Sequence, residues 1–159
     1  MKTVSIIFLL GVWNLGIAAD KPNFGGIWVL DKNKSFSNPP GFDQTMTITH
    51  SDEQIKIEGK QTTARGEFSI NESYTLDGKQ ADFTPPNPPN AKGKRKAYWL
   101  PNKRGFVVED EITADSPNGP TTQQITRKWV LATDGKTLTI DYHFDGARSG
   151  ESKRVFIKK

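Results

Sequence analysis

Apolar and polar side chains alternate along most of the chain after residue 20. In such a period-two pattern the apolar side chains share one face, which is typical of β-strands with one buried side. No stretch after residue 20 shows a convincing helical period. The alternation predicts about ten strands, at residues 24–31, 44–50, 54–62, 66–76, 79–84, 93–100, 105–113, 121–132, 136–145 and 150–158.

Short turns separate these segments. Asp77-Gly78 and Asp134-Gly135 favour hairpins, because glycine readily adopts the positive φ that tight hairpin turns need. Strands joined by short turns usually pair with their neighbours. We therefore expect an all-β fold, an antiparallel up-and-down barrel of about eight to ten strands, in which closure removes bare sheet edges. A β-sandwich is the alternative.

Two segments lack strand character. Residues 32–43 form a loop that contains proline and glycine and shows no helical pattern. Residues 83–90 form a second, proline-rich loop that we expect to be extended. The run from Pro85 to Pro89 is either a stiff connector or a rim that covers a pocket or meets a protein partner.

Residues 1–19 have the three parts of a secretory signal peptide. Lys2 supplies the positive charge, an apolar run follows, and small residues end the segment. The run is shorter than the roughly 20 residues that a membrane-spanning helix needs. We expect cleavage after Ala18 or Ala19, a secreted or periplasmic location, no membrane anchor, and a single barrel domain over residues 20–159.

Composition excludes several kinds of site. The chain has no cysteine, which excludes disulfides, thiolate metal sites and a lipid-modified cysteine. A formal charge of +4 is too small to indicate a nucleic-acid partner, and a hairpin folded about residues 102–103 would set the basic residues 94–96 opposite the acidic residues 109–111. No motif for a catalytic nucleophile or a phosphate loop occurs, so we expect no enzyme, cofactor or metal site.

Charged residues interrupt the apolar faces of four predicted strands. Glu72, Asp110 and Arg127 each share their parity with apolar neighbours, and Arg154 shares its parity with Phe156, although Val155 and Ile157 make that face ambiguous. Burying an unpaired charge is costly, so these residues must be paired, hydrated or bound to a ligand, unless a β-bulge turns a face outward. Two acids and two arginines would balance inside one barrel. Alternatively, the two arginines receive an anionic group, because the guanidinium fork suits a carboxylate or phosphate.

The two ends of the predicted barrel resemble those of the calycins, the superfamily of lipocalins and fatty-acid-binding proteins. Gly26-Ile27-Trp28 resembles their Gly-x-Trp start, and Arg154-Val155-Phe156 resembles the Arg-x-Tyr of the closing strand in fatty-acid-binding proteins. The resemblance implies a barrel in which Gly26 and Trp28 are structural, with Trp28 packed near the base against Arg154 or Arg127.

Two departures from the resemblance concern the ligand. Residues 32–43 are too short for the two-helix lid that fatty-acid-binding proteins insert after the first strand. Phe156 replaces the tyrosine whose hydroxyl helps to hold a carboxylate.

We therefore predict an exported small-molecule-binding protein, a carrier or sensor that holds a small amphipathic or anionic ligand inside the barrel. Large aromatic side chains with a few polar groups are typical of such pockets. The expected ligand-binding residues are Glu72, Tyr74, Asp110, Arg127, Trp129, Tyr142 and Arg154. The alternative is a protein-binding barrel, such as an inhibitor of an exported hydrolase, which would act through the loop from Pro85 to Pro89.

Overall fold

The computed structural model of the protein describes residues 21–37 and 41–159 and contains ten strands. The strands are β1 (Gly26–Leu30), β2 (Asp43–Ser51), β3 (Gln54–Thr63), β4 (Gly66–Thr75), β5 (Asp77–Phe83), β6 (Lys92–Trp99), β7 (Gly105–Ala114), β8 (Thr121–Leu131), β9 (Thr137–Gly146) and β10 (Gly150–Lys158). Their ends agree with the predicted strands within two residues. The signal peptide predicted at residues 1–19 lies outside the described residues.

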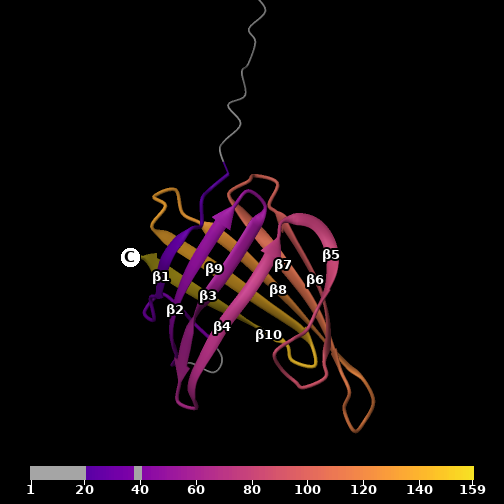
Figure 1. The fold of residues 1–159 in the computed structure, drawn as a ribbon. Helices are drawn as coiled ribbons and strands as arrows, with labels where there is room; N and C mark the ends of the chain where they lie inside the picture. The colour runs from indigo at the N-terminus through magenta and orange to yellow at the C-terminus, as the bar shows by residue number, and fades with distance from the viewer. Residues whose placement is uncertain (1–20, 38–40) are drawn as a thin grey trace, which may run out of the picture.

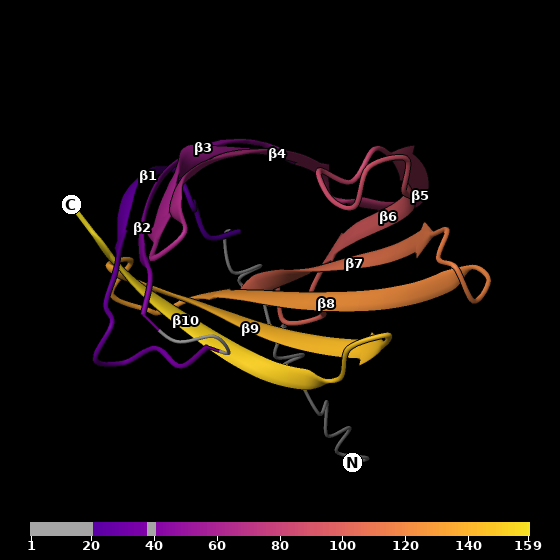
Figure 2. The same cartoon turned by 90° about the horizontal axis from the view of Figure 1, so that it is seen from below.

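All ten strands belong to one antiparallel sheet, in the order β4-β3-β2-β1-β10-β9-β8-β7-β6-β5. The sheet curls into a nearly closed barrel, with β1 to β4 forming one wall and β7 to β10 the other (Figures 1 and 2). Pairing of β1 with β10, in which Trp28 lies opposite Lys158, joins the first strand to the last. The prediction of an all-β antiparallel barrel is therefore confirmed.

The barrel is interrupted between β4 and β5, so the hairpin predicted at Asp77-Gly78 is wrong. These two strands are the two ends of the sheet order, and β5 pairs only with β6. The N–H of Leu76 donates instead to the carbonyl of Glu53, on the far side of β4 from β5. Gly78 does have the positive φ of 74° that its turn requires, but most of β5 is exposed. A strand without a buried face has little to hold it against its neighbour.

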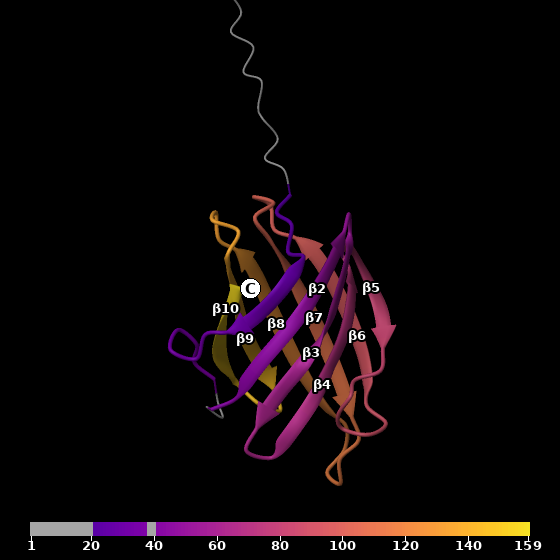
Figure 3. The same cartoon turned by 60° about the vertical axis from the view of Figure 1, so that its left-hand side comes forward.

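Apolar side chains fill the end of the barrel at which β1 begins. Figure 3 shows the start of β1 at this end of the barrel. Phe24, Trp28, Phe106 and Leu138 are fully buried there. Phe24 packs edge-on against Phe106 with ring centroids 5.0 Å apart, and its carbonyl accepts a hydrogen bond of 2.9 Å from Trp28 Nε1. The segment before β1 thus plugs this end, which we call the closed end.

The predicted register of the sixth and seventh strands is confirmed. Lys94, Arg95 and Lys96 lie opposite Glu111, Asp110 and Glu109. The side chains of residues 94 and 96 point outward with those of residues 109 and 111, so most of this charge ladder stabilises the outer surface. Arg95 has the opposite parity and points into the barrel.

The two loops predicted from proline and glycine are present in the described residues. Phe36 forms a single β-bridge with Lys153, and no helix occurs in residues 32–37 or 41–43. In the proline-rich loop at residues 83–90, Pro85 is buried, whereas residues 86–90 are exposed.

Candidate functional site

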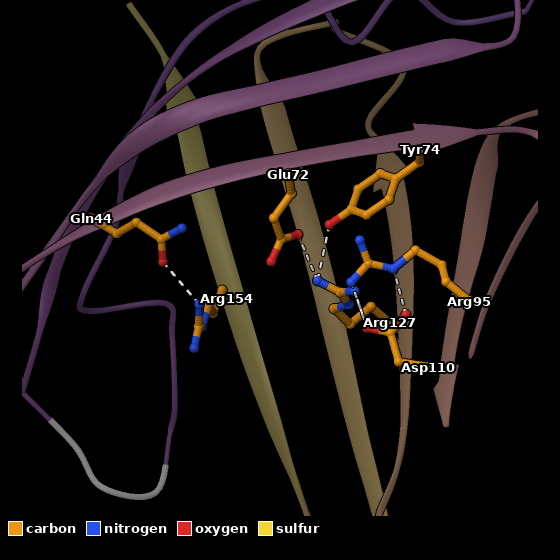
Figure 4. Close-up of polar contacts among 7 residues, drawn as sticks. All are labelled: Gln44, Glu72, Tyr74, Arg95, Asp110, Arg127 and Arg154. Carbon is orange, nitrogen blue, oxygen red and sulfur yellow. Dashed lines mark hydrogen bonds and ion pairs between the residues drawn. The ribbon is translucent and has the colours of Figure 1, made fainter. Parts of the chain in front are cut away.

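Polar side chains from the two walls meet halfway along the barrel (Figure 4). They come from strands that are far apart in the sequence, and alternation along each strand turns them inward. We call this group the polar layer; its members are Gln44, Glu72, Tyr74, Arg95, Asp110, Arg127 and Arg154. Four of the expected ligand-binding residues, Glu72, Tyr74, Asp110 and Arg127, form one connected network within it.

Arg127 is the centre of that network. Its Nη1 donates to Glu72 Oε2 at 2.7 Å and to the Tyr74 hydroxyl at 2.9 Å. Its Nη2 donates to Asp110 Oδ2 at 2.5 Å. Glu72 and Tyr74 lie on β4 whereas Arg127 lies on β8, so these bonds cross from one wall to the other (Figure 4).

Arg95 completes the network, and the sequence analysis missed it. Its Nε and Nη2 both donate to Asp110, at 2.6 and 2.9 Å, so Asp110 lies between two arginines. The guanidinium also lies 4.1 Å from the ring centroid of Phe83 and 4.9 Å from that of Tyr74. Arg95 shares its parity with Ala97, which is buried, and this pattern could have indicated that Arg95 points inward. Arg95 was instead assigned to the outer charge ladder because Lys94 and Lys96 flank it in the sequence.

Electrostatics keep Arg127 charged inside the barrel. Burial alone would lower the pKa of its guanidinium, but the charges of Glu72 and then Asp110 outweigh that effect and hold the pKa above its usual value. Arg95, Arg127, Glu72 and Asp110 therefore form a neutral set of two cations and two anions. Internal ion pairing accounts for Arg127.

Arg154 has a different environment. Among the described residues, no carboxylate lies within ion-pair distance of its guanidinium. Nη1 donates to Gln44 Oε1 at 2.9 Å, whereas the buried Nε has no hydrogen-bond partner within residues 21–37 and 41–159. The Arg154 guanidinium carbon lies 4.6 Å from the ring centroid of Phe42 and 4.5 Å from that of Tyr142. The polar layer as a whole thus carries one unbalanced positive charge, at Arg154.

Trp28 does not meet an arginine, so the pairing implied by the calycin resemblance is wrong in this detail. The cation over its ring is Lys158, 5.4 Å from the centroid, because Lys158 is its partner in the register of β1 and β10. Arg154 lies four residues before Lys158 on β10 and is therefore too far along the strand to reach Trp28. Gly26 has a φ of 137°, and a Cβ there would come within 2.5 Å of Lys158 Cε, so this position requires glycine.

Trp129 lies below the polar layer, in the closed half of the barrel. Its ring stacks on Phe106 at 5.2 Å and packs edge-on against Tyr74 at 6.3 Å. It is 2% exposed. Trp129 therefore supports the polar layer from beneath and does not reach the space above it.

A pocket of about 370 Å³ opens on the other side of the polar layer, at the end away from Phe24. We call it the open-end pocket. Its lining includes Phe42, Gln61, Phe68, Phe144 and Ser152, together with two arginines, the exposed Arg65 and Arg154. Tyr142 adjoins it, with its ring stacked on Phe144 at 6.1 Å and 12°. Phe42, Gln61 and Phe68 were not among the expected ligand-binding residues. Phe42 and Gln61 lie near turns, where alternation ends, whereas Phe68 shares the inward parity of Tyr74 on β4.

A larger hollow of about 740 Å³ lies at the closed end. Its lining consists of the loop residues Asp52 and Glu53 between β2 and β3 and of Lys21, Asn23, His50, Ser51, Gln54 and Thr75 around them. It lies outside the barrel and contains no member of the polar layer. The open-end pocket is therefore the better candidate site.

Residues 21–37 and 41–159 contain no group of three or more histidine, aspartate or glutamate side chains that could hold a metal ion. Within the same ranges, no helix is long and apolar enough to cross a membrane.

The fold is similar to that of apo lipid binding protein 8 from Caenorhabditis elegans. The two structures match with a TM-score of 0.56 over 86% of this chain and 95% of that one, at 13% sequence identity. The likeness supports the antiparallel β-barrel fold expected from the sequence. No protein-family model and no curated protein matches the chain.

Proposed function

We propose that this protein is an exported carrier or sensor that binds a small anionic molecule in the open-end pocket, with Arg154 as the anchor. One observation carries the proposal: Arg154 is a half-buried cation that faces the pocket and lacks an acidic partner among the described residues. The lipid-binding title of the structural neighbour is in keeping with a ligand-binding barrel.

The chemistry of Arg154 favours a carboxylate as the anionic group. A guanidinium offers five N–H donors in a planar fork that matches two carboxylate oxygens. Gln44 accepts from Nη1, and among the described residues no group accepts from Nη2, which is therefore available to a ligand oxygen. The Phe42 and Tyr142 rings limit the movement of the guanidinium and leave it preorganised.

Arg127 has a supporting role in this proposal. Glu72 and Asp110 already neutralise it, so an incoming anion would compete with two carboxylates at 2.7 and 2.5 Å. Arg127 holds the two walls together below the ligand. Of the two arginines expected from the sequence to receive an anion, we therefore retain Arg154.

Isothermal titration with 2-naphthoate and octanoate tests the proposal. At least one of them is expected to bind the purified protein, and Arg154→Gln should weaken that binding at least tenfold. Arg104→Gln is the matched control, because Arg104 is exposed in the turn between β6 and β7. Failure of both carboxylates to bind, or equal binding by the Arg154→Gln variant, refutes the anchor role.

Export is the second part of the proposal and rests on the sequence of residues 1–19. Mass spectrometry of the protein recovered from the culture medium or periplasm of an expressing bacterium should give a mature chain that starts at Ala19 or Asp20. A full-length chain retained in the cytoplasm would contradict it.

Protein binding through the proline-rich loop is a second candidate function, which the exposure of residues 86–90 favours. An inhibitor of an exported hydrolase would present such a loop at its rim. Deleting residues 86–89 should then abolish capture of a hydrolase from extracts and leave carboxylate binding unchanged. Unchanged capture by the shortened protein would exclude the loop.

A further inference from the structure

A cross-barrel group of Glu72, Tyr74 and Arg127, which we call the floor, lies deeper in the barrel than the residues that line the open-end pocket. Glu72 on β4 and Arg127 on β8 belong to opposite walls, yet their side-chain atoms lie 2.7 Å apart. The Tyr74 hydroxyl reaches the same guanidinium at 2.9 Å. Halfway along the barrel, a molecule that enters from the open end therefore meets this hydrogen-bonded group, beside the separate pair of Gln44 and Arg154 (Figure 4).

No room for a ligand is apparent beneath this floor in the described residues, because the closed half is packed with aromatic and aliphatic side chains. Trp28 and Phe106 are fully buried, and Phe106 stacks on Trp129 at 5.2 Å. Tyr74 links this packing directly to Arg127. A chain that extended past the floor would have to break the ion pairs of Arg127 and displace these rings as well.

The walls above the floor offer flat surfaces. Phe42 and Tyr142 contact the Arg154 guanidinium, and Phe144 continues the stack from Tyr142. Phe68, which is 51% exposed, contributes a further ring from β4. Aromatic rings attract one another in stacked and edge-on arrangements beyond the effect of buried area. A volume of about 370 Å³ lies near the small end of the range for ligand pockets.

We infer that the ligand is a compact aromatic carboxylate, with its carboxylate on Arg154 and its ring among Phe42, Phe68 and Phe144, and that long acyl chains are excluded. This inference rests on the proposed function and specifies its ligand class. The ion pair of Glu72 and Arg127, which lies beyond the pocket lining, limits how far a chain can extend into the barrel.

Titration of the purified protein with 2-naphthoate, octanoate and palmitate, each below its aggregation limit, tests the inference. We expect 2-naphthoate to bind at least tenfold more tightly than octanoate, and palmitate to bind no more tightly than octanoate. Palmitate binding as tightly as 2-naphthoate, or octanoate matching 2-naphthoate, overturns the inference and leaves the proposed function intact. Absence of binding by all three overturns the proposed function and, with it, this inference.

Replacement of Phe68, which is largely exposed, should alter the pocket without disturbing the fold, and Phe36 offers a matched control. Phe68→Ala should weaken 2-naphthoate about fivefold and change octanoate binding less than twofold. Phe36, 57% exposed on the outer surface, provides the control Phe36→Ala, which should leave both affinities unchanged. Equal effects of Phe68→Ala on the two ligands would overturn the aromatic part of the inference.

Discussion

Arg127 and Arg154 are the same residue type on neighbouring parts of one interior, and their partners give them different roles. Arg127 is 6% exposed and bonds to two carboxylates and a phenol. Arg154 has one amide partner and two aromatic neighbours. A buried charge with acidic partners contributes mainly to the folded structure, whereas a charge without them is available to a ligand.

Replacement of each arginine by glutamine should separate these roles in stability measurements. Arg127→Gln leaves Asp110 with Arg95 alone and Glu72 without its cation. We expect a loss of about 3 kcal/mol, the lower end for breaking a buried ion pair, because the side chain of Glu72 is 33% exposed. Arg154→Gln removes one hydrogen bond and should cost about 1 kcal/mol.

Urea unfolding followed by circular dichroism measures both values. Lys128→Gln, an exposed neighbour of Arg127 on β8, is the control and should change the midpoint little. A larger loss for Arg154→Gln than for Arg127→Gln would contradict the assignment of roles.

At the scale of elements, a histidine on β2 contributes to holding the segment before β1 in place. The N–H of Phe24 donates to His50 Nδ1 at 3.3 Å, and His50 Nε2 contacts the Asp52 carbonyl at 3.3 Å. The imidazole also packs against the rings of Phe24 and Trp99. His50 therefore holds the plug of the closed end in place, with Nδ1 as an acceptor.

The stability of the barrel should fall in mildly acidic solution because of His50. Burial lowers the pKa of His50 below its ordinary value of 6.5, an effect that its bond to Asp52 only partly offsets. The unfolded chain thus takes up a proton at a higher pH than the barrel does. Stability from this group is present above about pH 6.5 and is lost as the pH falls through the folded value.

The measurement is the thermal unfolding midpoint between pH 7.5 and 5.5, a range above the titration of most carboxyl groups. We expect the midpoint of the unaltered protein to decrease over this range and that of His50→Gln to decrease much less. His143→Gln should behave like the unaltered protein, since the side chain of His143 is 62% exposed. Identical slopes in all three proteins would show that His50 does not cause the decrease.

The sequence predicted the strands better than it predicted which strands pair and which side chains meet. Alternation predicted all ten strands and the inward orientation of Glu72, Asp110, Arg127 and Arg154. Both follow from the same pattern, because a strand with one buried face places every second side chain inside. The turn at Asp77-Gly78 was recognised, but a turn signal does not determine which edge the next strand joins. The net positive charge of the polar layer was not predicted. Arg95 was assigned to the outer surface, so the predicted interior held two acids and two arginines and appeared neutral.

The whole molecule has two sheet edges, at β4 and β5, and side chains bridge the opening between them. Arg95, on β6, lies over the rings of Tyr74 on β4 and Phe83 on β5. These contacts are weaker than a row of backbone hydrogen bonds, and β5 has only one paired neighbour. The strands β7, β8 and β9 have two paired neighbours each.

Amide hydrogen exchange should reproduce this difference. Peptides from β5 are expected to exchange first among the ten strands, and peptides from β7 to β9 last, because local opening is easiest where few buried contacts are lost. Mass spectrometry after digestion measures both groups in one experiment. Equal protection of β5 and β8 would imply a closed connection between β4 and β5.

The polar layer also bears on how the protein can change over evolution or by design. Residues that set the stability of the barrel lie on one side of it, whereas Gln61, Phe68 and Phe144, which shape the pocket, lie on the other. Substitutions at these rim positions leave the closed half untouched, so binding specificity can vary without a matching loss of folding. The barrel is therefore suited to libraries that randomise the rim and keep Arg154 constant.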